Sequence, residues 1–252
     1  MDICNTMSRK LPIGIQSFEK LRTGGYLYVD KTELVYRLAK AGIPCFLSRP
    51  RRFGKSLLLS TLEAYFLGKK DLFKGLAIER LEQDWLVYPV LHLDLNAEKY
   101  DSNERLANLL ESQLEAWEAE YGVTEINRSY SIRFMTVIRR AYEQTGRRGG
   151  GLVDENDRPM LRSFDNPELQ RDFRETLTAF YTVLKSADAY LQLVFITGVT
   201  KFAQMGIFSN LNQLQDISLH PAYTTLCGMT RAEIEAVFAP ELQSLARGNG
   251  LT

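Results

Sequence analysis

The segment that decides the fold is PCFLSRPRRFGKS, residues 44–56. Its first five residues form a short, mostly apolar run, which predicts a buried strand over 44–48. A basic turn follows, and residues 56–66 then place apolar side chains on one face, which predicts an amphipathic helix. A strand, a tight turn and a helix in this order form the local arrangement in which a helix N-terminus binds phosphate.

The end of the turn, Gly54-Lys55-Ser56, matches the end of the P-loop pattern G-x-x-x-x-G-K-[ST]. Gly54 allows backbone N–H groups to approach phosphate oxygens closely. Lys55 would place its ammonium near the β- and γ-phosphates, and the Ser56 hydroxyl would ligate Mg²⁺. The first glycine of the pattern falls at Arg49, so arginines would supply charge that backbone amides usually provide. The predicted nucleotide-binding residues are Arg49, Arg51, Arg52, Phe53, Gly54, Lys55, Ser56 and Leu57. The alternative is a basic strand–helix turn with an ordinary helix start.

Outward from this segment, short apolar runs alternate with long amphipathic segments, which is typical of an α/β layered domain. We expect further strands at 90–95, 152–155 and 191–196, the second of them weakened by the glycines at 149–151. The pattern favours a mostly parallel sheet with helices on both faces. Helices are expected at 31–41, 106–121 and 132–142. Another should follow the N-cap Asn166 with Pro167, and a last one should follow a capping box at Thr230. In this last helix Ile234 and Val237 would face inward, and Pro240 would end or bend it.

The expected organisation along the chain has three parts. Residues 1–10 form an N-terminal tail, residues 11–220 form the core, and residues 221–252 form a C-terminal helical segment. The last residues, 247–252, are rich in glycine and are typical of a chain cut within a linker.

A nucleotide site with Mg²⁺ also needs a carboxylate at the end of a neighbouring strand. Asp94 qualifies, and so does the pair Asp154-Glu155. We favour the pair, because Asp154 can hold the metal while Glu155 activates water as the catalytic base. The alternative for these acids is a solvated turn before Pro159. Thr197, at the end of the most apolar strand, offers a polar side chain at the same sheet edge as a candidate sensor.

Composition excludes several classes of protein. A chain of 252 residues with 45% apolar residues can bury a large core, so disorder over most of its length is excluded. Thirty-one basic and thirty-one acidic side chains give zero net charge, which disfavours a nucleic-acid partner. The three cysteines show no CxxC spacing, and neither a signal peptide nor a membrane-spanning apolar run is present. We therefore expect a cytoplasmic protein without a membrane partner.

Several blocks together resemble the AAA-ATPase-like family of prokaryotic proteins. The most specific is Arg49-Pro50-Arg51-Arg52-Phe53-Gly54-Lys55-Ser56, and the arginine in place of the first glycine is usual in that family. The blocks follow the family's order over roughly residues 11–252. The others are 28–32 (YVDKT), 154–159 (DENDRP), 197–202 (TGVTKF) and 207–212 (IFSNLN).

The resemblance implies a three-layer αβα P-loop NTPase fold of the AAA type. It implies ATP and Mg²⁺ as ligands, with Lys55 on phosphate, Ser56 and Asp154 on Mg²⁺, and Glu155 as the base. Relatives commonly self-associate and often continue into a PD-(D/E)xK nuclease-like domain, which we expect to be absent here. For Asp30 and Lys31 we expect a structural link between the N-terminal helix and the nucleotide pocket.

Three functions stay open at this point. The first is Mg²⁺-dependent ATP binding with slow hydrolysis to ADP and phosphate through the degenerate P-loop. The second is a nucleotide-sensing interaction module without useful catalysis. The third is a nucleic-acid-associated regulatory domain that uses the arginines of the turn.

Overall fold

The computed structural model describes residues 9–124, 129–200, 207–208, 211 and 213–248. Most of the expected N-terminal tail and the last four residues of the chain lie outside these ranges, as do parts of the blocks at 197–202 and 207–212. Within the described ranges, no helix combines the length and the apolar character that crossing a membrane requires.

The centre of the molecule is a five-stranded sheet in which every pairing is parallel. This confirms the predicted α/β class and its parallel sheet. From one edge to the other, the strands are β2 (Val90–Asp94), β3 (Gly149–Asp154), β4 (Leu191–Gly198), β1 (Cys45–Ser48) and β5 (Gln215–Asp216).

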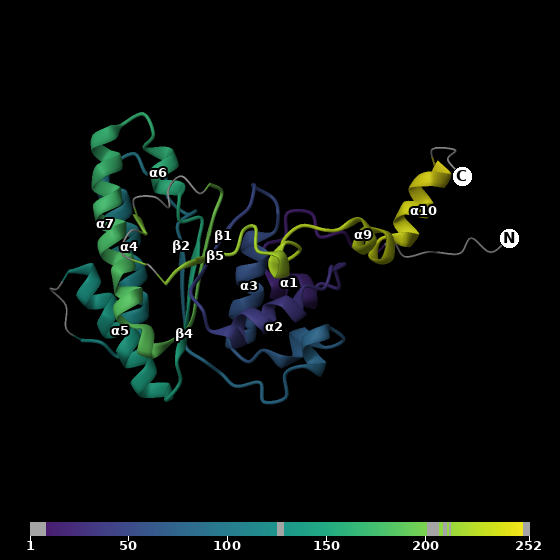
Figure 1. Ribbon diagram of the computed structural model, residues 1–252, viewed down its shortest axis with the longest axis horizontal. Coiled ribbons are helices and arrows are strands. Elements are labelled where there is room, and N and C mark those ends of the chain that lie inside the picture. Colours follow the sequence, from purple (N-terminus) through teal and green to yellow (C-terminus); the bar gives the residue numbers. More distant parts are fainter. Residues whose placement is uncertain (1–8, 125–128, 201–206, 209–210, 212, 249–252) are drawn as a thin grey trace.

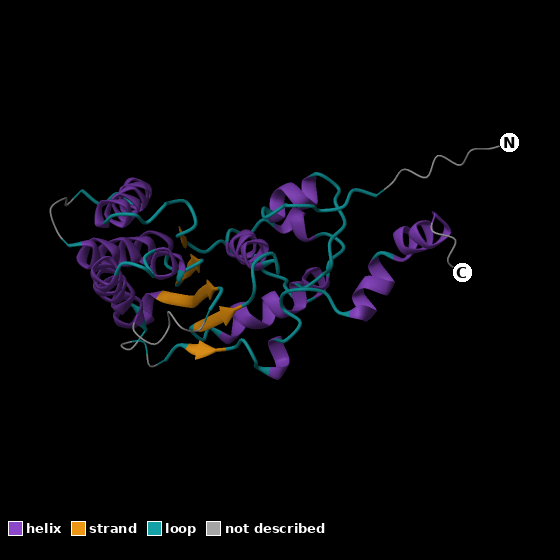
Figure 2. Cartoon of the chain, turned by 90° about the horizontal axis from the view of Figure 1, so that it is seen from above, coloured by secondary structure: helices purple, strands orange, loops and turns teal. Residues whose placement is uncertain are grey.

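Helices cover both faces of the sheet (Figures 1 and 2) and give it two separate hydrophobic cores. The side chains of β1 alternate between them: Phe46 packs into one core, whereas Cys45 and Leu47 pack into the other. This alternation is what a sheet covered on both faces requires. One face carries α1 (Phe18–Thr23), α2 (Thr32–Ala41) and α3 (Lys55–Phe66), and the other carries α4 (Asn103–Glu120), α5 (Tyr130–Thr145) and α7 (Pro167–Ser186).

Strand β3 is longer than predicted and includes the glycines that precede Leu152. It begins at Gly149, and all six of its residues are buried. A Cβ at Gly150 would lie 3.2 Å from the ring of Phe66, so the missing side chain lets α3 pack closely on the strand. The strand predicted at 152–155 is therefore present as Gly149–Asp154 and includes the three glycines.

Local capping signals were reliable. The Asn166 side chain accepts a hydrogen bond from Leu169 N at the start of α7, and Thr230 and Glu233 form a complete capping box at α9 (Arg231–Val237). Pro240 lies in the first turn of a separate helix, α10 (Ala239–Gly248). Ile234 and Val237, predicted to face inward, are half-buried, whereas Arg231, Ala232 and Glu235 are exposed; none of the described residues of α9 is fully buried. Figure 1 shows why: α9 and α10 lie beyond the layer of α1 to α3.

Asp30 and Lys31 connect elements of the fold. The Asp30 carboxylate accepts hydrogen bonds from Thr32 N (2.8 Å) and from Ala77 N (2.7 Å), which fixes the start of α2 against the short helix η2 (Ala77–Arg80). Lys31 forms an ion pair with Glu233 of α9. The short helices α6 (Arg158–Arg162), η1 (Lys70–Phe73), η3 (Asp188–Tyr190) and η4 (Pro221–Tyr223) complete the described elements.

Candidate functional site

The carboxyl ends of the parallel strands meet at one edge of the sheet, beside the N-terminus of α3. Asp94 of β2 pairs in register with Asp154 of β3, and Ser48 of β1 pairs with Gly198 of β4. In open α/β sheets, ligands bind outside this edge of the strands. The fold therefore places both candidate carboxylates and the glycine–lysine–serine turn at the edge where a ligand is expected.

The loop of residues 49–54 opens α3 with a backbone suited to anions. Gly54 is the N-cap of the helix and has φ +90°, a left-handed conformation that favours glycine. No described atom lies within 4 Å of the position that a Cβ would take there. The first amides of the helix have no intrahelical acceptor. Ser56 and Leu57 are half-buried in this first turn, whereas Arg51, Arg52 and Phe53 are exposed.

Lys55 is the centre of the site. Its side chain is only 3% exposed, and its Nζ lies 3.0 Å from Glu155 Oε1. The same ammonium donates to the carbonyl of Arg49 at 3.1 Å and lies 3.5 Å from that of Pro50. A buried ammonium is thus held by one carboxylate oxygen and by carbonyls of the loop itself.

Asp154 and Glu155 have different partners. The Thr197 hydroxyl donates to Asp154 Oδ1 at 2.5 Å and accepts from Glu155 N at 3.3 Å. Thr197, the candidate sensor, is therefore bound to both acidic residues. The structure brings Lys55, Asp154, Glu155 and Thr197 together at one place, which the spacing in the sequence did not require.

The guanidinium of Arg49 donates hydrogen bonds to main-chain carbonyls of this chain. Nη1 donates to the carbonyls of Ser48 (2.9 Å) and Ser218 (2.7 Å), and Nη2 lies 3.5 Å from the carbonyls of Tyr223 and Thr224. The loop is attached a second time at Phe53, whose carbonyl accepts from Gly228 N at 3.0 Å. These bonds fix the loop to the segment 218–228.

Sequence reasoning gave no role to Asn156, Asp157 or Ser218, although all three are buried beside the site. The Ser218 hydroxyl accepts a hydrogen bond from Ser48 N at 2.8 Å, and Asp157 binds the backbone beyond β4. The signal for Asp157 was its place in the block after Glu155. Ser218 lies in no pattern that the sequence offered.

The residues present fit Mg²⁺ held jointly with phosphate. Mg²⁺ in nucleotide sites keeps several waters and takes one or two carboxylates together with phosphate oxygens. The Ser56 hydroxyl and the Asp154 carboxylate carry oxygen atoms of the kind that such a site would use. Within the described residues, no group of three or more acidic, histidine or cysteine side chains is arranged to hold a metal without a nucleotide.

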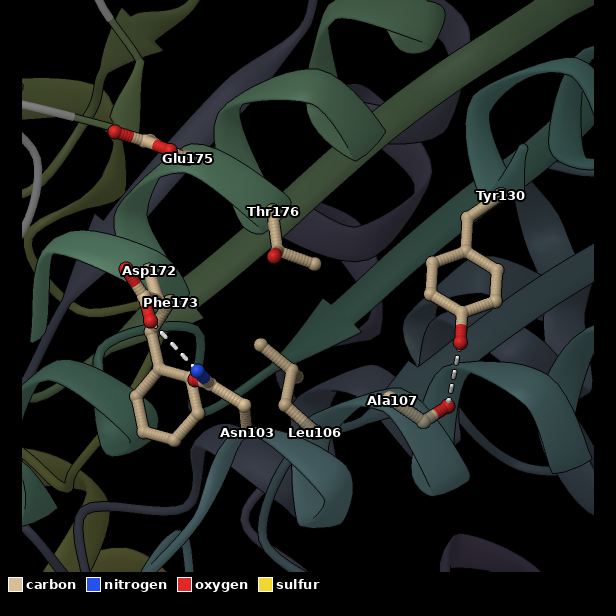
Figure 3. Close-up of a pocket in the computed structure, with 8 residues that line it drawn as sticks. All are labelled: Asn103, Leu106, Ala107, Tyr130, Asp172, Phe173, Glu175 and Thr176. Atoms are coloured by element: carbon tan, nitrogen blue, oxygen red, sulfur yellow. Dashed lines mark hydrogen bonds between the residues drawn. The ribbon is translucent and has the colours of Figure 1, made fainter. Parts of the chain in front are cut away.

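Figure 3 shows a cavity that is separate from this edge, between α4, α5 and α7 on the opposite face of the sheet from α3. Its volume is about 260 Å³. It contains none of the residues predicted to bind nucleotide. The lining residues are Asn103, Leu106, Ala107, Tyr130, Asp172, Phe173, Glu175 and Thr176.

An all-parallel sheet, covered by helices on both faces and carrying a glycine–lysine–serine helix start at its strand ends, defines a three-layer P-loop-like α/β domain. The family model described as "Predicted AAA-ATPase" matches residues 12–208, and the chain belongs to this AAA-ATPase-like family. Membership suggests nucleotide binding in general.

The chain is similar to a curated protein of Azotobacter chroococcum mcd 1, described as "Uncharacterized protein in vnfD 5'region". The two are 42% identical over 244 residues, which cover 96% of this chain and 47% of the relative. The chain thus spans about half the length of that relative. No solved structure matches the chain.

Proposed function

We propose that this chain binds Mg²⁺-ATP at the edge of its sheet and hydrolyses it slowly. The observation that carries the proposal is the buried ammonium of Lys55, next to the open turn at Gly54 and the first amides of α3. Triphosphate oxygens would replace the Glu155 carboxylate as the acceptor for this ammonium. Such an exchange keeps the buried charge paired, which is the condition for burying it at all.

The remaining residues of the loop complete the phosphate site. The exposed cations of Arg51 and Arg52 would approach the outer phosphates, while Phe53 and Leu57 flank the loop. Arg49, predicted from the sequence as a phosphate ligand, is better suited to hold the loop, since its guanidinium already has carbonyl acceptors. Ser56 and Asp154 would hold Mg²⁺, which when bound neutralises charge on the phosphates.

Glu155 is the candidate base. Released from Lys55, its carboxylate can accept a proton from a water molecule beside the terminal phosphate. Slow hydrolysis is expected because this carboxylate starts in an ion pair that must open first. The same ion pair favours a second candidate function, nucleotide sensing without useful turnover, in which Glu155 never reaches water.

The test is ATP affinity after Lys55→Ala, measured by calorimetry. Losing the charged partner of the phosphates should cost about 2–5 kcal/mol, which is about 30-fold or more in affinity. Lys70→Ala is the matched control, because Lys70 is exposed beyond the opposite end of α3. Unchanged affinity in folded Lys55→Ala protein would remove the P-loop interpretation.

A further inference from the structure

The turn that carries the candidate base has an unusual backbone. We call residues 154–157 the acid turn. At Glu155, directly after β3 ends, φ is +53°. A residue with a Cβ rarely adopts this left-handed conformation. The surrounding structure must therefore hold Glu155 in place, and such conformations concentrate at functional sites.

The end of β4 supplies that support. Glu155 N donates to Thr197 Oγ1 at 3.3 Å. Asn156 donates twice to the Thr197 carbonyl, from its backbone N at 2.9 Å and from its side-chain Nδ2 at 2.6 Å. Asp157 Oδ2 accepts from the amides of Val199 (2.9 Å) and Thr200 (2.7 Å). Each residue of the acid turn is thereby bound to residues 197–200.

The two segments also fit closely. A Cβ at Gly198 would lie 2.7 Å from Asn156 Nδ2 and 3.2 Å from Asp157 Cγ, so only glycine allows this approach without a shift. Asn156 is 1% exposed and Asp157 is fully buried. Asp157 stands at the N-cap of α6, yet in the described part of the chain its side chain makes no capping hydrogen bond there. Its carboxylate instead accepts hydrogen bonds from the backbone amides directly after β4.

We propose that Asn156 and Asp157 are positioning residues, which bind the end of β4 and thereby hold the Glu155 carboxylate against Lys55. The positioning itself is a property of the free protein. Its consequence for turnover rests on the proposed function: once phosphate has replaced the Glu155 carboxylate at Lys55, the same bonds keep the released base within reach of water, and a displaced turn would carry it away.

The test measures the Lys55–Glu155 contact directly. Acylation of Lys55 by an amine-reactive acetyl ester is followed by mass spectrometry, with exposed Lys70 of the same molecule as the internal reference. Glu155→Gln removes the ion pair and gives the rate for Lys55 held only by the loop carbonyls. Gly198→Ala inserts the clashing Cβ, and its matched control is Gly151→Ala on β3, where a Cβ meets ordinary contacts at 3.7 Å.

We expect Gly198→Ala to speed Lys55 acylation about tenfold, the factor for losing one hydrogen bond to a charged group. Asp157→Ala should do the same, whereas Asp157→Asn keeps an oxygen acceptor and should restore the parent rate. Gly151→Ala should react like the parent. With ATP present, Asp157→Ala should lower phosphate release while ATP affinity stays near that of the parent.

Parent-like acylation of Lys55 in Gly198→Ala and Asp157→Ala would overturn the inference, and so would equal acceleration in Gly151→Ala. If Gly198→Ala does not fold, the contrast between the two Asp157 variants decides. Failure of the proposed function looks different: ATP would leave Lys55 acylation in the parent unchanged, while the contrast between the two glycine variants would persist.

Discussion

Two buried ion pairs, one between helices on one face of the sheet and one at the carboxyl ends of its strands, differ in how the charged group is held. Between α4 and α5, Arg133 donates two hydrogen bonds of 2.7 Å to Glu118 and a third of 2.5 Å to Glu111. At the sheet edge, Lys55 has one carboxylate oxygen of Glu155 and the carbonyls of its own loop.

The two ion pairs differ in how easily another group could replace the carboxylate partner of the buried cation. The planar guanidinium of Arg133 is matched by carboxylates in a fixed geometry, and the hydrogen bond to Glu118 raises the pKa of Arg133 above its ordinary value. The ammonium of Lys55 is a point charge that accepts any well-placed oxygen. The first pair is therefore suited to join two helices, and the second is suited to exchange its partner for a ligand.

Breaking the fixed pair should have the largest effect on folding. Glu118→Ala leaves Arg133 buried without its main partner, so we expect a loss of about 3–5 kcal/mol in the free energy of unfolding. Urea unfolding measures this loss, with Glu115→Ala on the exposed side of α4 as the control. A loss below about 1 kcal/mol would mean that the pair behaves like a surface ion pair.

Breaking the exchangeable pair should affect folding less and chemistry more. In Glu155→Gln, the ammonium of Lys55 keeps its carbonyl acceptors. We therefore expect the free energy of unfolding to fall by only about 1.5 kcal/mol, the contribution of one hydrogen bond to a charged group. Phosphate release should fall about 10²–10⁴-fold, since the candidate base is gone, while ATP still binds.

The control for this variant is Asp165→Asn, which removes an exposed acid after α6. If the parent releases phosphate no faster than Glu155→Gln, the chain senses nucleotide without useful catalysis. If Glu155→Gln instead unfolds as readily as Glu118→Ala, the distinction between the two pairs is lost.

The sequence predicted what local patterns determine. The apolar run before the turn predicted β1, and the signals at Asn166 and Thr230 predicted the starts of α7 and α9. It failed where packing between distant residues decides. The glycines of β3 looked unfavourable because strand propensity is local, whereas the fit of Gly150 against Phe66 depends on a residue more than eighty positions earlier.

The same limit applies to the site. Chemistry allowed Lys55, Asp154 and Glu155 to be chosen, because phosphate and metal ligands come from few residue types. The bonds of Arg49 to Ser218 and of Asp157 to Val199 could not be predicted, since main-chain carbonyls and amides leave no trace in residue identity. The supporting contacts of a site are therefore harder to find from sequence than its ligands.

A third pair, His92 with Glu63 on α3, extends the comparison to a more exposed contact. His92 Nδ1 lies 3.1 Å from Glu63 Oε2, and the two side chains are 25% and 36% exposed. Burial acts to lower the pKa of His92, but the hydrogen bond and charge of Glu63, with Asp154 and Asp94, raise it above its ordinary value. The hydrogen bond from His92 also lowers the pKa of Glu63.

These two shifts fix the pH window of the pair. Because the pKa of His92 is raised in the folded protein, its stabilisation of the fold is fully present below the unfolded histidine pKa of about 6.5. This stabilisation is lost as pH rises through the folded pKa. Because the pKa of Glu63 is lowered in the folded protein, its stabilisation of the fold is fully present above the unfolded glutamate pKa of about 4.3. This stabilisation is lost as pH falls through the folded pKa. Between these limits, His92→Gln should lose less than about 1 kcal/mol, because a partly exposed pair is screened by solvent. Urea unfolding of both proteins from pH 5 to pH 8 should show the difference shrink as pH rises, and a difference that grows instead would mean that His92 is held neutral in the folded protein.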